Sequence, residues 1–273
     1  MTKKRDILAS SRRLKRKRIL FRVALGATGF LVLFAAVSAL FYISAVRIKN
    51  ISVSGNSTLE SGEIISAASG FLRGKYFGIY PRDNILIFPK EEISAGLAEK
   101  FGRIKKVVVE GDFPDSLLIN ITERKPTALF CGAQPEADSR EEDFVCFFID
   151  EDGIVFERAP DFSDNVYVKF YAESEDGVSE KIPEKISGFK KMMKFTEAAR
   201  RGGVDIMKVV MEKEGLRKFY ISEGWYIMLK ENDDFQTALE NLELALEEKI
   251  KDSRKYLEYI DLRFGNKLFY KYK

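Results

Sequence analysis

The feature that most constrains this chain is a stretch of 24 residues, 23–46, without one charged side chain. A helix rises about 1.5 Å per residue, so the stretch would span roughly 36 Å, enough to cross a hydrocarbon core of about 30 Å. Its residues are apolar on every face, whereas a helix at the surface of a water-soluble domain keeps one polar side. We therefore predict a transmembrane helix over residues 23–46.

The flanking charges predict how that helix is oriented. Residues 1–22 hold ten Lys and Arg side chains against the single carboxylate of Asp6, whereas only Arg47 and Lys49 follow closely. By the positive-inside rule, the N-terminus stays in the cytoplasm and the bulk of the chain lies outside. We interpret the basic tail as a topology determinant and expect no nucleic-acid partner.

A cleaved secretory signal is the alternative interpretation of the same residues. Val37-Ser38-Ala39 would serve as a cleavage site. However, the apolar core of a signal peptide is about 7 to 15 residues long, and this run continues well past that site. The length favours a retained anchor.

The absence of histidine excludes whole classes of chemistry. No Ser-His-Asp or Cys-His nucleophile and no His-ligated metal can be built, and we expect no cofactor, no metal and no small-molecule substrate. The two cysteines, Cys131 and Cys146, flank 14 residues. Outside the membrane they could form a disulfide worth about 3 kcal/mol, or they could remain buried thiols, and both interpretations stay open.

Residues 47–126 predict a small α+β domain. The expected elements are a strand through Ile51 and Val53, a helix capped by Ser61, a helix opened by Pro89 and stopped by Gly102, and strands over 104–110 and 117–123. We expect one core from the apolar residues of these elements: Ile51, Val53, Leu97, Phe101, Val107, Ile119 and Ile121.

At this point the residues resemble a known family. Val53, Gly55 and Asn56, the turn with Pro114, and Glu123-Arg124-Lys125-Pro126 are similar to a POTRA domain, in the version found in the FtsQ/DivIB cell-division proteins. The hairpin at Asp150 to Gly153 and the segment Tyr259-Ile260-Asp261-Leu262-Arg263-Phe264 extend the resemblance to the C-terminus. One departure is the connection between Gly70 and Pro89, which is longer than the family's usual one and contains Tyr76, Phe77, Tyr80 and Pro81.

Beyond Pro126 the sequence predicts short strands and one long helix. The strands are expected at 128–131, 144–149, 166–171, 226–230, 256–264 and 267–272. The helix starts at Asp233 or Asp234 and carries an apolar stripe of Phe235, Leu239, Leu242, Leu246 and Ile250, which we expect to pack on a sheet. Gly265-Asn266 predicts a hairpin turn between the last two strands.

The expected fold class is α+β, with a single transmembrane helix, a POTRA domain of order β-α-α-β-β, and a mostly antiparallel β domain with flanking helices. The expected division of the chain is a basic cytoplasmic tail (1–22), a transmembrane helix (23–46), the POTRA domain (47–126) and the C-terminal β domain (127–273).

Three classes of function compete. The resemblance implies a non-catalytic scaffold of the septal cell membrane, which binds other single-pass division proteins similar to FtsB/DivIC and FtsL and helps to control septal peptidoglycan synthesis. A POTRA-bearing transport or assembly factor would need a C-terminal barrel of strands, but residues 235–253 are helical in pattern. A wall-active serine enzyme is suggested by Ser187-Gly188-Phe189-Lys190 and Ser163-Asp164-Asn165, yet their order is reversed and no Lys-Thr-Gly occurs.

The resemblance also implies where a partner binds, because in this family a segment of another division protein adds to the C-terminal strands. Alternation places Ile260, Leu262 and Phe264 on one face of the strand and Tyr259, Asp261 and Arg263 on the other, so one face can pack while the other stays available. We expect Arg263 to pair with a partner carboxylate, and Phe264, Phe269 and Tyr270 to supply aromatic anchors. The expected site comprises Tyr259, Asp261, Arg263, Phe264, Lys267, Phe269 and Tyr270. The alternative is that Lys267 and Lys271 protect the edge against pairing.

Overall fold

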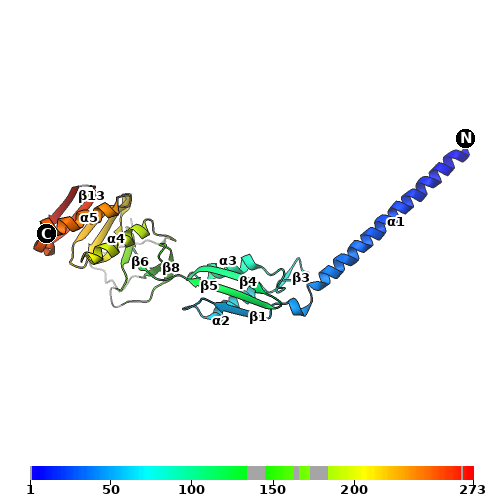
Figure 1. The fold of residues 1–273 in the computed structure, drawn as a ribbon, viewed down its shortest axis with the longest axis horizontal. Coiled ribbons are helices and arrows are strands. Elements are labelled where there is room, and N and C mark those ends of the chain that lie inside the picture. Colours follow the sequence, from blue (N-terminus) through cyan, green and yellow to red (C-terminus); the bar gives the residue numbers. More distant parts are fainter. Residues whose placement is uncertain (1, 134–144, 163–165, 173–183, 266) are drawn as a thin grey trace. The chain divides into compact units, whose positions relative to one another are not determined.

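The chain folds into two compact units, Met1–Glu123 and Arg124–Lys273. This computed structural model describes residues 2–133, 145–162, 166–172, 184–265 and 267–273, with side chains described from residue 17 onward except that of Leu40. Figure 1 shows the order of the elements along the chain. The fold is of the α+β class, with an apolar N-terminal helix, a POTRA-type domain and a large, mostly antiparallel sheet with flanking helices, as predicted.

The first unit begins with a long helix, α1 (Thr2–Leu40). Its segment Lys17–Ala39 is long and apolar enough to cross a membrane. The helix ends six residues before the uncharged run does. Phe41 and Tyr42 follow in a turn, and a short 3-10 helix, η1, covers Ser44–Val46. The side-chain amide of Asn84 donates to the carbonyl oxygen of Phe41 over 3.0 Å, so a contact from far along the chain helps to stop the helix there.

A three-stranded sheet with two helices forms the rest of this unit. Its elements are β1 (Asn50–Ser54), α2 (Ser61–Phe71), the short strands β2 (Lys75–Tyr76) and β3 (Tyr80–Pro81), α3 (Lys90–Lys100), β4 (Ile104–Asp112) and β5 (Ser116–Glu123). The sheet order is β1-β5-β4, in which β1 is parallel and β4 antiparallel to β5. A parallel pair requires a crossover, and both helices lie in the connection that supplies it.

The core of this unit forms between the helices and the sheet. Ile64, Ala68, Ile93, Leu97, Val109, Leu117 and Ile119 are fully buried, and all seven residues predicted for the core belong to this cluster. Ile51, Val53 and Val107 are only partly buried, because β1 and β4 are the two edges of a small sheet, and Phe101 is partly buried just after the end of α3.

The start of α2 differs from the prediction. Glu60 is the N-cap residue and makes no side-chain capping bond, whereas Ser61 is already helical. The Ser61 hydroxyl instead receives a hydrogen bond from the Asn56 side chain over 3.1 Å. The Ser61 hydroxyl, which we expected to cap the helix, is therefore bonded to the turn that precedes the helix.

The second unit is built on one nine-stranded sheet. In chain order it contains β6 (Ala128–Ala133), β7 (Phe147–Ile149), β8 (Val155–Arg158), β9 (Lys169–Ala172), α4 (Phe189–Arg201), β10 (Ile206–Met211), η3 (Lys213–Gly215), β11 (Leu216–Ile221), β12 (Tyr226–Lys230), α5 (Phe235–Ala245), a π-turn η4 (Leu246–Ile250), a 3-10 segment η5 (Lys251–Tyr256), β13 (Leu257–Phe264) and β14 (Lys267–Tyr272). The sheet order is β14-β13-β12-β11-β10-β9-β6-β7-β8.

Both long helices of this unit pack on one face of the sheet. Phe189, Met192 and Phe195 of α4 and Leu242 of α5 lie in the same buried cluster as Phe219 and Ile260 of the strands and Trp225, which directly precedes β12. Figure 1 shows the two helices against the sheet. The regular part of α5 is shorter than predicted, since it ends at Ala245 and the stripe continues through the π-turn to Ile250. The helix starts where expected, because the Asp234 carboxylate accepts a hydrogen bond from the backbone of Gln236 over 3.0 Å.

Cys131 and Cys146 are joined by a disulfide. β6 and β7 pair with Phe130 opposite Phe147, so the next pair in register is the two cysteines. The disulfide lies in a smaller cluster on the other face of the sheet, with Leu129, Phe148 and Tyr171. Of the two interpretations that the sequence left open, the structure has the disulfide.

Candidate partner-binding edge

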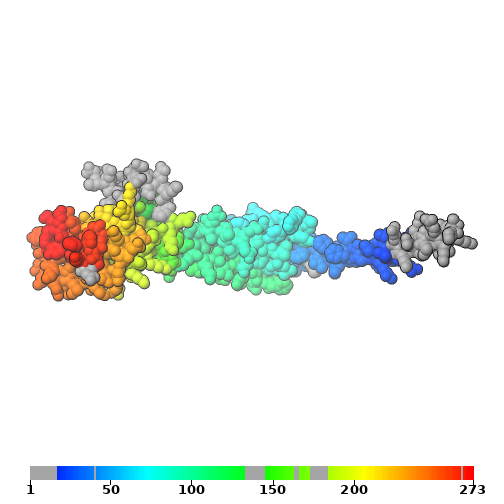
Figure 2. All heavy atoms as spheres, turned by 90° about the horizontal axis from the view of Figure 1, so that it is seen from above, coloured from blue at the N-terminus to red at the C-terminus, as the bar shows by residue number. Residues whose placement is uncertain are grey.

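The C-terminal strand β14 forms one edge of the nine-stranded sheet. It pairs with β13 on one side, and no strand of the described chain pairs with its other side. Four aromatic side chains of β13 and β14 are largely exposed: Phe264 (55%), Phe269 (52%), Tyr270 (42%) and Tyr272 (38%). Figure 2 shows these C-terminal residues, in red, at the molecular surface. Unpaired backbone groups beside exposed aromatic rings can accept an added strand.

The exposed rings pack against one another in two pairs. The rings of Phe264 and Phe269 meet edge to face, 5.3 Å apart, and those of Tyr270 and Tyr272 do so at 5.4 Å. Leu268 packs on the core and fixes β14 to the domain. Tyr272 was not among the predicted site residues, although its two-residue spacing from Tyr270 places both on one face of the strand.

Arg263 and Asp261 form an ion pair with each other on β13. Arg263 donates from Nε to Asp261 Oδ1 over 2.8 Å and from Nη2 to Oδ2 over 2.6 Å. This bond raises the pKa of Arg263, and the Asp261 carboxylate is buried. The chain itself thus supplies a carboxylate to Arg263, and the pairing of Arg263 with a partner carboxylate stays a prediction.

Phe264, which we expected as an aromatic anchor, is exposed, although simple alternation places it on the face of Ile260 and Leu262. Ile260 and Leu262 are buried, but the pairing of β13 with β14 shifts register between Asp261 and Phe264. A bulge of this kind interrupts alternation, so Phe264 leaves the core face and joins the exposed rings.

The lysines of the edge have distinct surroundings. Lys271 Nζ lies 2.6 Å from Glu258 Oε2 on the neighbouring strand, and this hydrogen bond raises its pKa. Lys267 is exposed beside the turn. The charge of Lys271 is thus largely engaged within the sheet.

A row of tyrosines crosses the face of the sheet opposite α4 and α5. Tyr226 lies between Tyr220 and Tyr259, with ring centroids 5.2 and 5.7 Å away, and Lys208 and Lys218 lie over the rings of Tyr220 and Tyr226. Burial raises the pKa of Tyr226, against the opposing charge of Lys218. Of this row only Tyr259 was predicted, although the alternation of Lys218 and Tyr220 with buried neighbours was a readable signal.

The predicted POTRA residues gather around two turns. Gly55 has φ +79°, and a Cβ there would lie 2.1 Å from the carbonyl oxygen of Ile121, so only glycine fits. Asn56 donates to the carbonyl oxygen of Leu59 over 2.7 Å. Glu123 closes the same turn by accepting from the backbone N–H groups of residues 57, 58 and 59 at 2.7 to 3.0 Å. Val53 is partly buried and Pro114 lies exposed in the β4–β5 turn.

Arg124 and Pro126 start the second unit. Arg124 Nη1 donates to Asp150 Oδ2 over 2.5 Å, and Asp150 is almost fully buried. The other oxygen of Asp150 accepts from the backbone of Asp152 and Ile154, both at 2.9 Å. The carboxylate therefore holds the hairpin turn together, and Pro126 lies half-buried just before β6.

The residues of the first serine-enzyme motif are bonded to other side chains of the C-terminal domain. The Ser187 hydroxyl donates to Glu231, which also binds Arg217 over 2.5 Å, and Lys190 pairs with Asp152 at 2.6 Å. The second imitation motif, Ser163-Asp164-Asn165, lies outside the described residues, as do the acidic residues 134–143. Among the described residues no group of three His, Cys, Asp or Glu side chains could hold a metal ion.

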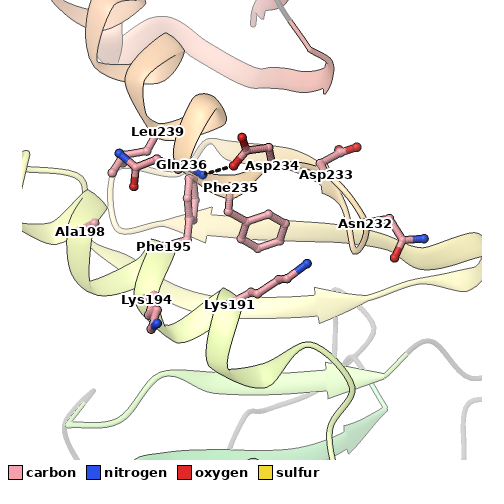
Figure 3. A pocket seen from close by; sticks show the side chains of 10 residues that line it. All are labelled: Lys191, Lys194, Phe195, Ala198, Asn232, Asp233, Asp234, Phe235, Gln236 and Leu239. Atoms are coloured by element: carbon pink, nitrogen blue, oxygen red, sulfur yellow. Dashed lines mark hydrogen bonds between the residues drawn. The ribbon is translucent and has the colours of Figure 1, made fainter.

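A shallow cavity of about 470 Å³ lies between α4 and the start of α5. Figure 3 shows Lys191 and Lys194 on one side and Asp233 and Asp234 on the other, with Phe195 and Phe235 between them. Asp234 is engaged by Thr237 and Gln236, which lower its pKa. These contacts are those of a helix cap, so the cavity adds no candidate site.

Comparison with known proteins bears on both units. A family model described as "POTRA domain, FtsQ-type" matches residues 46–124, and one described as "Cell division protein FtsQ/DivIB, C-terminal" matches residues 141–263. A search of the curated proteins found no match. The two matches lie in the expected order behind the apolar helix, and together they span both units. The chain therefore belongs to the FtsQ/DivIB family of bacterial cell-division proteins.

Proposed function

We propose that this cell-division protein is a single-pass scaffold whose C-terminal edge captures other division proteins outside the membrane. The observation that carries the proposal is the unpaired side of β14 beside Phe264, Phe269 and Tyr270. Family membership supports it, because FtsQ/DivIB proteins interact with other division proteins. An incoming strand would gain affinity from backbone hydrogen bonds and specificity from the exposed rings.

The proposed partners are single-pass proteins similar to FtsB/DivIC and FtsL. Their segment would add beside β14, with Tyr259, Asp261, Arg263 and Lys267 positioning the edge rather than all touching the partner. The internal Asp261–Arg263 pair supports this division of roles, since both side chains are already bonded to each other. We propose that capture places the chain at the septum and helps to control septal peptidoglycan synthesis.

The proposed topology has residues 1–22 in the cytoplasm and the POTRA and C-terminal domains outside. The domain limits that we propose are 23–46 for the anchor region, whose membrane-crossing helix ends at Leu40, 47–126 for the POTRA domain and 127–273 for the C-terminal domain. We further propose that the chain is not an enzyme. The contacts of Ser187 with Glu231 and of Lys190 with Asp152 support this, because both groups of the imitation motif serve the fold.

Co-purification from solubilised membranes tests the proposal, with the tagged full chain as bait and FtsB/DivIC- and FtsL-like proteins as the measured prey. Changing Phe264 and Tyr270 together to Ala should weaken capture by about 30-fold or more, since an aromatic hot spot contributes about 2 kcal/mol. Leu244→Ala is the matched control, because Leu244 is equally exposed (55%) but lies on α5. Removing residues 267–273 should abolish capture.

Circular dichroism must show that the double variant stays folded. The proposal is overturned if capture survives both changes and is instead lost in Phe113→Ala, which alters an exposed side chain of the POTRA domain. The partner site would then lie in the other unit.

A further inference from the structure

The connection between α2 and α3 contains a hairpin that contributes no residue to the core of its unit. β2 and β3 pair Lys75 with Pro81 and Tyr76 with Tyr80. Phe77 and Ile79, at the tip, are 95% and 52% exposed. Phe77 also has φ +50°, a backbone conformation that bulky residues rarely adopt. An exposed phenylalanine held in such a conformation indicates a contact that the isolated chain does not show.

The hairpin is bound to the end of α1. The hydroxyl groups of Ser38 and Tyr80 are 2.9 Å apart, and the rings of Phe41 and Tyr80 are 5.3 Å apart. The hydroxyl of Tyr42 donates to the carbonyl oxygen of Ile79. Figure 1 shows β3 beside the end of this helix.

These contacts set the level of the hairpin relative to a membrane. The segment that could cross it ends at Ala39, and residues 38–42 are those that the hairpin touches. A span of 23 residues is about 34 Å long and therefore matches the hydrocarbon core. With this segment across a bilayer, the tip would lie at the height where hydrocarbon gives way to headgroups.

Two basic side chains beside the hairpin are available to anions. Arg73 and Lys75 line a cavity of about 420 Å³ together with Arg47 and Lys49. Arg47 pairs with Asp83 at 2.5 Å and Lys49 with Asp115 at 3.0 Å. No carboxylate of the described residues pairs with Arg73 or Lys75.

We propose that the β2–β3 hairpin contacts the bilayer beside α1: Phe77 and Ile79 enter the outer leaflet, and Arg73 and Lys75 bind the phosphates of anionic phospholipids. Apolar tips with flanking tyrosines and cations are the composition of interfacial segments, and tyrosines 42, 76 and 80 surround this tip. Basic side chains near a membrane surface are attracted to anionic lipid. The inference rests on the proposed anchoring by α1.

The contact would give the POTRA domain a second attachment to the membrane besides the anchor. Arg82, which directly follows β3, connects the hairpin to the rest of the domain. Its guanidinium group lies 5.1 Å from the ring centre of Tyr76 and pairs with Glu92 of α3. The base of the hairpin is thereby tied to the domain while its tip projects from it.

Tryptophan fluorescence of the full chain in lipid nanodiscs tests the proposal. Phe77→Trp should show a blue-shifted emission and at least twofold quenching by lipids brominated near the headgroup. The control is Glu99→Trp, because Glu99 is exposed at the end of α3 that leads into β4, away from the hairpin. The native Trp225 is fully buried in the second unit and supplies the background signal in the unmodified chain.

The lipid charge is tested in the same discs. Quenching of Phe77→Trp should be stronger with phosphatidylglycerol than with phosphatidylcholine, and Arg73→Gln with Lys75→Gln should remove that difference. Equal quenching of the Phe77 and Glu99 probes, or none of either, would overturn the proposal, and a probe shielded without brominated lipid would indicate a protein contact instead. Co-migration of the chain with the discs reports the anchor separately, so failure of the hairpin contact is distinguishable from failure of the anchor.

Discussion

At the scale of single residues, Glu123 shows how one carboxylate organises a turn. Burial opposes its charge, but the N–H groups of residues 57–59 and the Ser57 hydroxyl outweigh that effect and lower its pKa below 4.5. The same turn requires Gly55, whose backbone passes against Ile121. The turn therefore explains three of the predicted motif residues: Gly55, Asn56 and Glu123.

Glu123→Gln should lower the free energy of unfolding of the POTRA domain by about 1–2 kcal/mol at pH 7, since charge-assisted hydrogen bonds are lost. The folded-state pKa is depressed, so the stabilisation is present above pH 4.5 and disappears as the pH falls through the lower folded value. Urea unfolding of residues 47–126 between pH 3 and 7 measures it. A difference in unfolding free energy between the native domain and Glu123→Gln that stays constant from pH 3 to 7 would contradict the explanation.

The disulfide provides a second prediction at this scale. Changing Cys131 and Cys146 to Ala should lower the free energy of unfolding of the C-terminal domain by about 3 kcal/mol, because the unfolded chain gains the freedom of a loop of about 15 residues. Alanine is the suitable replacement, since Cys131 is buried and a serine hydroxyl there would lack water. A reducing agent should reproduce the loss in the native chain and leave the double variant unchanged.

At the scale of elements, the sequence predicted a helix or strand best where the apolar spacing lies within that one element. Helix α3 and strands β4 and β5 followed from periodicity, because their apolar spacing reflects a face of the element itself. Helix α4 and strands β10 and β11 were not predicted, although Phe189, Met192, Phe195 and Ala199 have helical spacing. The bulge before Phe264 and the pairing of the cysteines depend on strand register, which a single sequence does not display.

Leu97 in α3 and Ile119 in β5 test the packing of these elements. Both side chains are fully buried in one cluster, so truncation of either to Ala should cost about 2–5 kcal/mol of unfolding free energy. Leu86→Ala is the control, because Leu86 is 62% exposed and its loss should change stability by less than about 0.5 kcal/mol. Chemical denaturation of the POTRA domain distinguishes the two outcomes, and a small effect at both buried sites would mean that the core has been misassigned.

At the scale of the whole molecule, the chain comprises two units that each have their own hydrophobic core, and the apolar helix α1 belongs to the first of them. The charge difference across the helix was readable from the sequence, and the proposed topology rests on it. The sheet edge and the rings of Phe264, Phe269 and Tyr270 were expected from the sequence, whereas the exposed ring of Tyr272 was not.

Protease added to spheroplasts should digest most of the protein and leave a small membrane-bound fragment that contains the basic tail, because the positive-inside rule keeps that tail in the cytoplasm. Immunoblotting with a tag at each terminus measures this. Resistance of the C-terminal tag in sealed spheroplasts would reverse the topology, and a mature protein that begins near Ala39 would replace the anchor with a cleaved signal.

The open side of β14 also has a consequence for gene dosage. A backbone edge does not distinguish its proper partner from any other extended segment, and Lys271, which could repel a stray strand, is occupied by Glu258. Copies of the chain made in excess of their partners would carry unsatisfied edges that can pair with one another. Balanced synthesis of the chain and its partners would then protect the cell from misassembly, a safeguard that belongs to expression rather than to the fold.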